Sequence, residues 1–221
     1  AGTSGRLGVL DAAECPPTYG VDPGLVIGLI AGGEKAMFIA QEGAEDSLDL
    51  AKKDLTDYQL GDKDTVIGLA ASGRTPYVIG GLQFAREIGA LTGAISCVQG
   101  AEISKFAQYP IEAVTGAEAI MGSTRMKAGT AQKLILNMIS TSVMIKLGKV
   151  YKNYMVDLKP SNKKLVIRSK NMIRTLTGVS EDRAEQLYEE SGHSVKKALI
   201  MEIMNVDKEV AENALRNGSG H

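Results

Sequence analysis

Short apolar segments that end in polar, glycine-containing loops constrain the fold of this chain more than any other feature of its sequence. In the clearest example, residues 64–70 are apolar almost throughout, residues 71–76 form a polar loop, and a helical segment follows to about Ile88. Strands that are apolar throughout are typical of a parallel sheet with helices on both faces. The strands expected on this pattern span residues 24–31, 64–70, 92–97 and 112–114. The predicted fold class is therefore α/β.

Three helices are expected around these strands, over residues 42–53, 76–88 and 126–150. The last of them is apolar around much of its circumference, since Leu134 and Met138 recur on one side and Ile135 and Ile139 on another. A helix with this pattern is buried inside a domain or at a contact between subunits. Both placements remain open for residues 126–150.

The character of the chain changes at about Ser161, where strand signals stop and charged residues become frequent. Ser180 is suited to cap a helix that starts directly after it. Short helices are expected over residues 165–176, 181–191, 195–204 and 208–217. The predicted organisation is an α/β domain over residues 1–160 and a helical domain over 161–217, followed by a linker or tag over 218–221.

The first residues have the composition of a turn between a strand and a helix, although no strand precedes them. The chain also begins with Ala1 rather than with Met. We therefore expect it to be a fragment that lacks its natural N-terminus.

Charge and cysteine content exclude several classes of protein. Lys and Arg together number 25 and Asp and Glu 26, so the formal net charge is −1, which argues against a protein that coats nucleic acid or an anionic membrane. Two cysteines cannot form a disulfide scaffold. The longest apolar stretch is far shorter than the roughly 20 residues that span a bilayer. A cytoplasmic protein is the expectation.

Three loops combine glycine with hydroxyl side chains, and each also carries a cation. Backbone N–H groups and hydroxyls at the start of a helix suit the oxygens of a phosphate or a sugar. The candidate binding residues are Thr3 and Ser4 in the first loop, Ser72, Gly73, Arg74 and Thr75 in the second, and Ser123, Thr124 and Lys127 in the third. None of the loops matches the phosphate-binding pattern of nucleotide hydrolases or a dinucleotide fingerprint. The alternative is that they are ordinary turns in which the hydroxyls cap helices.

Two carboxylates are candidates for acid–base chemistry. Glu14 lies just before Pro16 and Pro17, which restrict the backbone around it, and Glu45 lies at the start of a predicted helix. Either could instead be a solvated residue near a helix end, where acidic residues are favoured at the N-terminus. The two histidines, His193 and His221, and the two cysteines are not spaced as metal ligands, so we expect neither a metal nor a cofactor.

Four motifs in order resemble the N-acetylmuramic acid 6-phosphate etherase family, whose members adopt the SIS (sugar isomerase) fold. The motifs are residues 1–7 (AGTSGRL), 14–20 (ECPPTYG), 71–77 (ASGRTPY) and 122–133 (GSTRMKAGTAQK), and the resemblance extends over residues 1–217. It implies a flavodoxin-like parallel-sheet sandwich and a small UBA-like helical bundle at the C-terminus. It also implies a bacterial enzyme of the cytoplasm, and that the family's first strand and N-terminal helices are missing from this chain.

The resemblance implies a specific reaction. The family cleaves the lactyl ether at C3 of N-acetylmuramic acid 6-phosphate by elimination and water addition, giving N-acetylglucosamine 6-phosphate and D-lactate in cell-wall sugar recycling. Neither a metal nor an organic cofactor takes part. By the resemblance, Glu14 and Glu45 are the acid–base pair, in either assignment of roles. Ser4, Ser72 and Thr75 match phosphate-loop positions most directly, and Glu118 is a further candidate for the site.

The resemblance also implies a homodimer, with residues 126–150 as the candidate contact, and a phosphosugar as the small-molecule partner. Two alternatives stay open. One is a sugar-phosphate isomerase of the same fold, and the other is a non-catalytic sugar-phosphate sensor resembling the glucokinase regulatory protein. Release of lactate separates the etherase from both.

Overall fold

The computed structural model describes residues 1–41, 43–160 and 162–218 of the 221-residue chain. The chain forms two compact units, which are described separately below. The first unit comprises Ala1–Ala13 and Ile27–Met138, and the second comprises Glu14–Val26 and Ile139–His221. Glu42 and Ser161, where a helix and the helical domain were predicted to begin, lie outside the described residues, as do residues 219–221 of the predicted tag.

A three-stranded parallel sheet forms the centre of the first unit, in the order β1 (Thr65–Leu69), β2 (Leu91–Ser96) and β3 (Tyr109–Glu112). Thr65 pairs with Leu91, and Gly93 with Tyr109. The strands predicted over residues 64–70 and 92–97 are confirmed. The strand predicted over 112–114 is wrong in position, because β3 is an edge strand that contains Pro110 and exposes most of its residues. An edge strand tolerates a proline and does not need to be apolar throughout.

The predicted strand over residues 24–31 is wrong, since this segment forms turns and irregular backbone. Its apolar residues are only partly buried: Ile27 is 45% exposed, whereas Ile30 is 5% exposed. At Gly28 the segment lies directly against α1 (Gly2–Tyr19), because a Cβ atom built there would lie 2.5 Å from the Cα atom of Val9. The glycine therefore serves close packing on a helix and not strand pairing.

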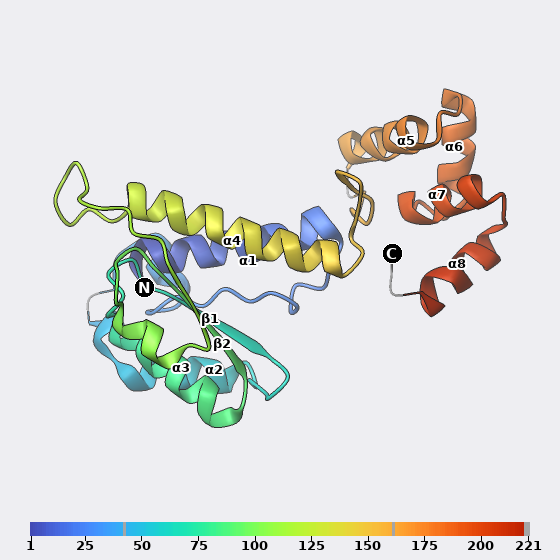
Figure 1. Ribbon diagram of the computed structural model, residues 1–221. Coiled ribbons are helices and arrows are strands. Elements are labelled where there is room, and N and C mark those ends of the chain that lie inside the picture. Colours follow the sequence, from blue (N-terminus) through green and yellow to red (C-terminus); the bar gives the residue numbers. More distant parts are fainter. Residues whose placement is uncertain (42, 161, 219–221) are drawn as a thin grey trace. The chain divides into compact units, whose positions relative to one another are not determined.

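Helices cover both faces of the sheet (Figure 1). On one face, Gly68 of β1 faces α3 (Pro76–Ile88), where an added Cβ atom would lie 2.6 Å from Val78, and α2 (Leu48–Asp57) packs on α3. The neighbouring residue, Leu69, faces the other side, where its side chain would lie 3.0 Å from a Cβ atom on Gly8 of α1. Successive strand residues point to opposite faces. The predicted α/β class with helices on both faces is therefore confirmed.

The helices of the first unit begin at positions that differ from the predictions. Helix α1 already starts at Gly2, so the first hydroxyl loop is the first turn of a helix and not a turn before one. The helix predicted from residue 42 is a short 3-10 turn, η2 (Ala44–Asp46), followed by α2, whose start is capped by Ser47 through a 3.2 Å hydrogen bond from the Leu50 amide. Helix α4 spans Lys127–Lys146 and ends before the predicted residue 150. The remaining 3-10 turns are η1 (Glu34–Met37) and η3 (Glu102–Phe106).

The second unit contains four short helices around one apolar core (Figure 1). The helices are α5 (Lys163–Thr177), α6 (Glu181–Glu190), α7 (Val195–Met204) and α8 (Lys208–Asn217). Each begins with a capping side chain that accepts a hydrogen bond from the amide three residues later: Asn162, Ser180, Ser194 and Asp207, respectively. The predicted helices and the Ser180 cap are confirmed, and the C-terminal part is the expected helical bundle. A small hairpin of β4 (Val150–Tyr151) and β5 (Tyr154–Met155), which was not predicted, precedes it.

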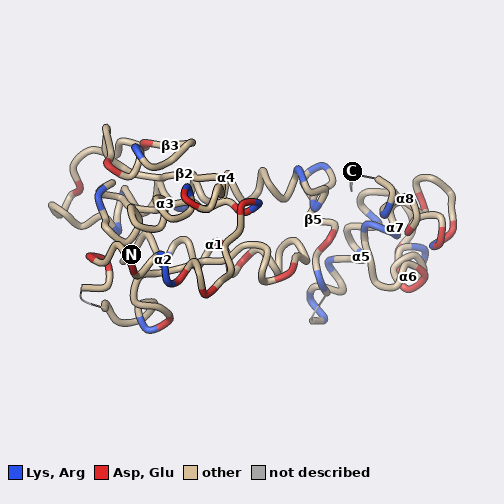
Figure 2. Tube along the Cα trace, turned by 90° about the horizontal axis from the view of Figure 1, so that it is seen from below, with Lys and Arg blue, Asp and Glu red and all other residues tan. Residues whose placement is uncertain are grey.

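Charges of opposite sign separate within this bundle (Figure 2). Helix α5 carries lysines and arginines and no acidic residue, whereas α6 carries mostly acidic residues. Lys170 of α5 pairs with Glu185 of α6 at 2.7 Å, and Arg183 of α6 pairs with Glu202 of α7 at 3.1 Å. These pairs are partly exposed, so each adds little to stability.

Candidate functional site

The loop after β1 places Ser72, Arg74 and Thr75 at the start of α3. Ser72 and Arg74 are exposed, and Thr75 is the N-cap residue of α3 without using its side chain as the cap. The turn depends on Gly73, whose φ of +69° and close approach to Ala101 leave no room for a side chain. The Gly73 carbonyl accepts a 2.9 Å hydrogen bond from the Ile103 amide. A rigid loop with free hydroxyls and a guanidinium at a helix N-terminus can hold an anion.

The start of α1 lies beside α4 in the same unit. Ser4 is buried, and its hydroxyl donates a 2.8 Å hydrogen bond to Oε1 of Gln132 in α4. A Cβ atom on Gly129 of α4 would lie 3.4 Å from the side-chain methyl of Thr3. The first two predicted hydroxyl residues are therefore in contact with α4.

The third loop leads into α4, and Glu118 binds the start of that helix. Its carboxylate accepts hydrogen bonds from the amides of Ala128 at 2.9 Å and Lys127 at 3.1 Å. The Ala128 bond contributes most to holding the pKa of Glu118 below its ordinary value, with the Lys127 amide and charge adding to it. This carboxylate therefore occupies the end of α4 that favours an anion. Ser123 is half-buried, and Thr124 and Lys127 are exposed.

Small buried residues join two of these loops at the carboxyl edge of the sheet. Ala71 after β1, Cys97 after β2 and Ala128 at the start of α4 form one buried cluster. Burial raises the pKa of the Cys97 thiol, and the nearby charge of Glu118 raises it further. The structure thus brings the second and third predicted loops together where parallel sheets bind ligands.

Glu45 is exposed in η2, in the same unit as the three loops. Ala44 packs against the cluster of buried residues that includes Tyr77 and Ala101, and so does Ala1. The turn that carries Glu45 and the residue before α1 therefore pack on the same buried cluster of the first unit.

Glu14 is exposed on α1 and belongs to the second unit. The next residue, Cys15, is buried against Val21 and Met144. Pro16 and Pro17 continue the helix, and the amide of Gly20 bonds the Pro16 carbonyl at 2.9 Å. The backbone around Glu14 is thus restricted, as predicted, because Glu14 lies within helix α1 and the adjacent Cys15 is buried.

Two polar residues of the first unit were not predicted as parts of the site. Glu112 ends β3, and its carboxylate accepts hydrogen bonds from the amides of Gly100 and Ala101 and from the Ser104 hydroxyl. Gln132 is fully buried in α4 and bonds Ser4. The signal for Gln132 was present in the sequence as a polar residue among Ala128, Ala131, Ile135 and Leu136. Nothing in the local sequence indicates the partners of Glu112.

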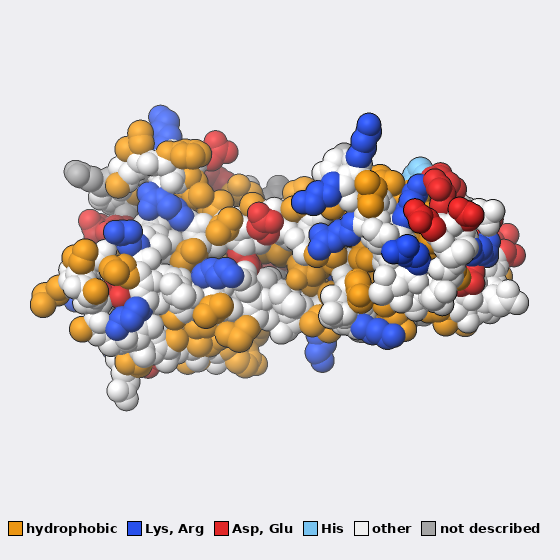
Figure 3. Space-filling view, turned by 90° about the horizontal axis from the view of Figure 1, so that it is seen from above, with side chains coloured by type: hydrophobic (Ala, Val, Ile, Leu, Met, Phe, Trp, Pro, Cys, Tyr) orange, Lys and Arg blue, Asp and Glu red, His pale blue; other side chains and the backbone are white. Residues whose placement is uncertain are grey.

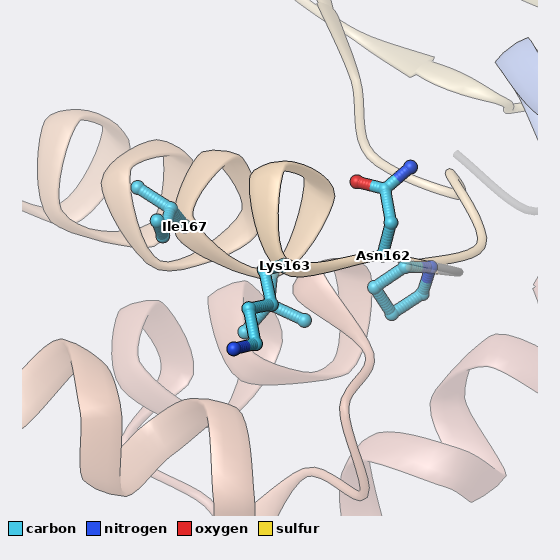
Figure 4. A pocket seen from close by; sticks show the side chains of 5 residues that line it. Asn162, Lys163 and Ile167 are labelled. Carbon is cyan, nitrogen blue, oxygen red and sulfur yellow. The ribbon is translucent and has the colours of Figure 1, made fainter.

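A pocket at the start of α5 is lined by Pro160, Asn162, Lys163, Val166 and Ile167 (Figure 4). None of the predicted site residues lines it. The residues that line it include no carboxylate and no histidine, and the side-chain oxygen of Asn162 accepts a 3.0 Å hydrogen bond from the Leu165 amide. The chemistry suggested by the sequence therefore has no place in this pocket.

No three His, Cys, Asp or Glu side chains within residues 1–41, 43–160 and 162–218 are grouped as a metal site. None of the helices in these ranges has the length and apolar character needed to cross a bilayer.

Known proteins match this chain along its whole length. Residues 1–86 match the glucokinase regulatory protein N-terminal SIS domain, and residues 152–216 match the C-terminal lid domain of glucokinase regulatory protein. An N-acetylmuramic acid 6-phosphate etherase of Clostridium botulinum is 65% identical over 221 residues, which are 100% of this chain and 73% of that protein. The enzymes of that name from Francisella tularensis subsp. holarctica and Lactobacillus gasseri are each 59% identical, covering 99% and 100% of this chain and 74% of each relative. The chain therefore belongs to the N-acetylmuramic acid 6-phosphate etherase family.

Proposed function

We propose that this chain is an enzyme that cleaves the lactyl ether at C3 of N-acetylmuramic acid 6-phosphate. The products are N-acetylglucosamine 6-phosphate and D-lactate, so the enzyme is a carbon–oxygen lyase that serves the recycling of cell-wall sugars. The observation that carries the proposal is the 65% identity, over the whole chain, to a relative named for this substrate. Within the first unit, the hydroxyls and the guanidinium at the start of α3 support it.

The phosphate is the part of the substrate that the first unit is best equipped to hold. Ser72, Arg74 and Thr75 present hydroxyls and a positive charge at the start of α3, and Ser4 lies in the first turn of α1. Lys127 is an additional exposed cation. Binding energy from this remote group can position the reacting carbons, which raises the rate of the chemical step.

Two carboxylates match the two proton transfers of the reaction. Opening of the sugar ring creates an aldehyde at C1, which acidifies the proton on C2. One carboxylate removes that proton, and the C3 oxygen leaves with a proton from a second acid. Water then adds at C3 of the unsaturated aldehyde. We assign the C2 proton to Glu45 and the leaving oxygen to Glu14, and the reverse assignment stays open. Each such group contributes about 10²–10⁴-fold to the rate.

The test is release of D-lactate from N-acetylmuramic acid 6-phosphate, with the unphosphorylated sugar as the control. We expect release that requires the phosphate. Binding of the phosphosugar without release would instead indicate a sensor like the glucokinase regulatory protein. Conversion between aldose and ketose phosphates would indicate an isomerase.

We also propose that the enzyme is a cytoplasmic homodimer of bacteria and that α4 forms the contact. Leu134 and Met138 of α4 are 52% and 60% exposed, and Figure 3 looks onto this side of the first unit, where hydrophobic side chains gather. Apolar side chains left on the surface of a helix are typical of an interface. Cell fractionation tests the location. Limited proteolysis tests the proposed domains over residues 1–160 and 161–217, with cleavage near residue 160 as the expected result.

A further inference from the structure

The side-chain amide of Gln132 is fully buried and only half satisfied. Its Oε1 accepts a 2.8 Å hydrogen bond from the Ser4 hydroxyl, but its Nε2 has no hydrogen-bond partner in the part of the chain that the structure describes. Burying an unpaired polar group is unfavourable, so native proteins rarely keep one without a reason. Its neighbour, Ser4, lies in the first turn of α1, where backbone N–H groups have no partner within the helix.

The amide of Gln132 can hydrogen-bond Ser4 in either of two orientations. In the orientation described above, Oε1 accepts from Ser4 and Nε2 is unpaired. In the reversed orientation, Nε2 donates to the oxygen of Ser4, and Oε1 takes the position in which Nε2 has no partner. Each orientation makes one hydrogen bond to Ser4, and the two ends of an amide are almost equal in size, so reversal needs no repacking.

The orientation decides what Ser4 can bind. When Oε1 accepts the Ser4 hydrogen, the hydroxyl offers a ligand only lone pairs, which repel an anion. When Nε2 donates to Ser4, the hydroxyl hydrogen is free to bond a phosphate oxygen. An anion at the start of α1 therefore favours the reversed amide.

We propose that Gln132 is a positioning residue for anion binding: its amide reverses when a phosphate reaches the start of α1 and so turns Ser4 into a donor. This inference depends on the proposed function at one point, the identification of the anion as the phosphate of the substrate. Gln132 does not itself touch the substrate.

Binding of inorganic phosphate at pH 8, measured by titration calorimetry, tests this without relying on turnover. We expect Ser4→Ala to weaken binding about tenfold, as for loss of one hydrogen bond to a charged group. Gln132→Glu should weaken binding equally, because a carboxylate accepts the Ser4 hydrogen but cannot donate. Gln132→Met, which neither accepts nor donates, should stay within about threefold of the unsubstituted protein.

The double variant Ser4→Ala/Gln132→Met should bind no more weakly than Ser4→Ala, because Gln132 acts only through the Ser4 hydroxyl and methionine adds no charge. Asn137→Met is the matched control. Asn137 donates a 2.7 Å hydrogen bond to Asp11 between the same two helices, so its loss should lower the melting temperature without changing phosphate affinity. Multiplying losses in the double variant, or phosphate affinity in Gln132→Glu equal to that of the unsubstituted protein, would overturn the proposal.

A second measurement applies if Gln132→Glu does not fold. The side-chain amide resonances of Gln132 should shift as phosphate is added to the unsubstituted protein and should not shift in Ser4→Ala. Absence of the shift in the unsubstituted protein would also reject the proposal. Lactate release is independent of these results, so failure of the inference and failure of the proposed function are distinguishable.

Discussion

The Ser104 hydroxyl donates a 2.6 Å hydrogen bond to the carboxylate of Glu112, which also accepts from the amides of Gly100 at 2.7 Å and Ala101 at 3.0 Å. Ala101 in turn packs against Gly73 in the loop after β1. Glu112 therefore connects the end of β3 to the loop that we propose binds phosphate, although it lies outside that loop.

We expect Glu112→Ala to raise the KM for the phosphosugar about tenfold while kcat changes less, because the loop behind Gly73 loses three hydrogen bonds. Steady-state kinetics provides the measurement. Glu112→Gln keeps an acceptor and serves as the control, with an intermediate KM expected. Equal effects on KM and kcat in both variants would contradict a role in positioning the loop.

The pH dependence of stability should reflect the same carboxylate. The Ser104 hydrogen bond, followed by the bonds from Gly100 and Ala101, holds the pKa of Glu112 below its ordinary value. The stability that Glu112 adds is therefore present above its pKa in the unfolded chain, about 4.3, and is lost as pH falls through the lower folded value. Thermal unfolding below pH 5 should show a steeper decline for the unsubstituted protein than for Glu112→Gln.

Substitution of the two proposed catalytic carboxylates should affect kcat, whereas substitution of residues that bind phosphate should affect substrate affinity. We expect Glu14→Gln and Glu45→Gln each to lower kcat by about 10²–10⁴-fold with little change in substrate affinity. Exchange of the C2 proton with deuterium separates their roles. Retained exchange without lactate release in Glu14→Gln would support Glu14 as the acid, whereas near-normal turnover in either variant would remove that residue from the mechanism.

Gly73 should tolerate no side chain. Its φ is +69°, and an added Cβ atom would lie 2.5 Å from the Cβ atom of Ala101, so Gly73→Ala combines backbone strain with a clash. Gly100 is a matched control, because its φ is +66° but nothing lies within 4 Å of an added Cβ atom. We expect Gly100→Ala to destabilise the protein by about 1 kcal/mol and Gly73→Ala by about 2–4 kcal/mol, measured by urea unfolding. Equal losses would show that the loop moves away from Ala101.

The proposed dimer predicts a specific pair of disruptive changes. Leu134→Glu and Met138→Glu place charges on the exposed side of α4, and we expect light scattering at micromolar concentration to change from a dimer to a monomer. Lys133→Glu tests whether charge alone is responsible, since Lys133 is also exposed on α4 and is not apolar. A monomer before any substitution would reject the dimer.

The parts of the fold that could be predicted are those with a strong local pattern. β1 and β2 are apolar throughout and bounded by glycine or polar loops, and the four short helices have capping residues at their starts. The segment around Gly28 is equally apolar but lies on α1, a distinction that depends on a distant partner. The predicted position of β3 was wrong because an edge strand needs no continuous apolar run and tolerates Pro110.

The site shows the same division between local and distant information. The hydroxyl loops could be identified because glycine, serine and threonine lie together in the sequence. The glycines and small residues at the start of α1 are typical of a turn, because they are poor helix formers. In the structure they form the first turn of a helix, in which Thr3 and Ser4 contact α4. The partners of Glu112 and Gln132 are separated from them along the chain, so the local sequence marks Gln132 as a polar residue in an apolar setting but indicates neither partner.

The pairing of α1 with α4 also sets the order in which the first unit can form during synthesis. The hydrogen bond from Ser4 to Gln132 joins residues 128 positions apart, whereas β1, α3 and β2 follow one another directly along the chain. Contacts between neighbouring segments form early, and those that close a long loop form late. The face of the sheet that α3 covers can therefore pack while the ribosome is still producing the rest of the unit, whereas the other face, where Leu69 meets α1, gains α4 only after that helix has been synthesised. The first turn of α1 reaches its final surroundings only at that last step of folding.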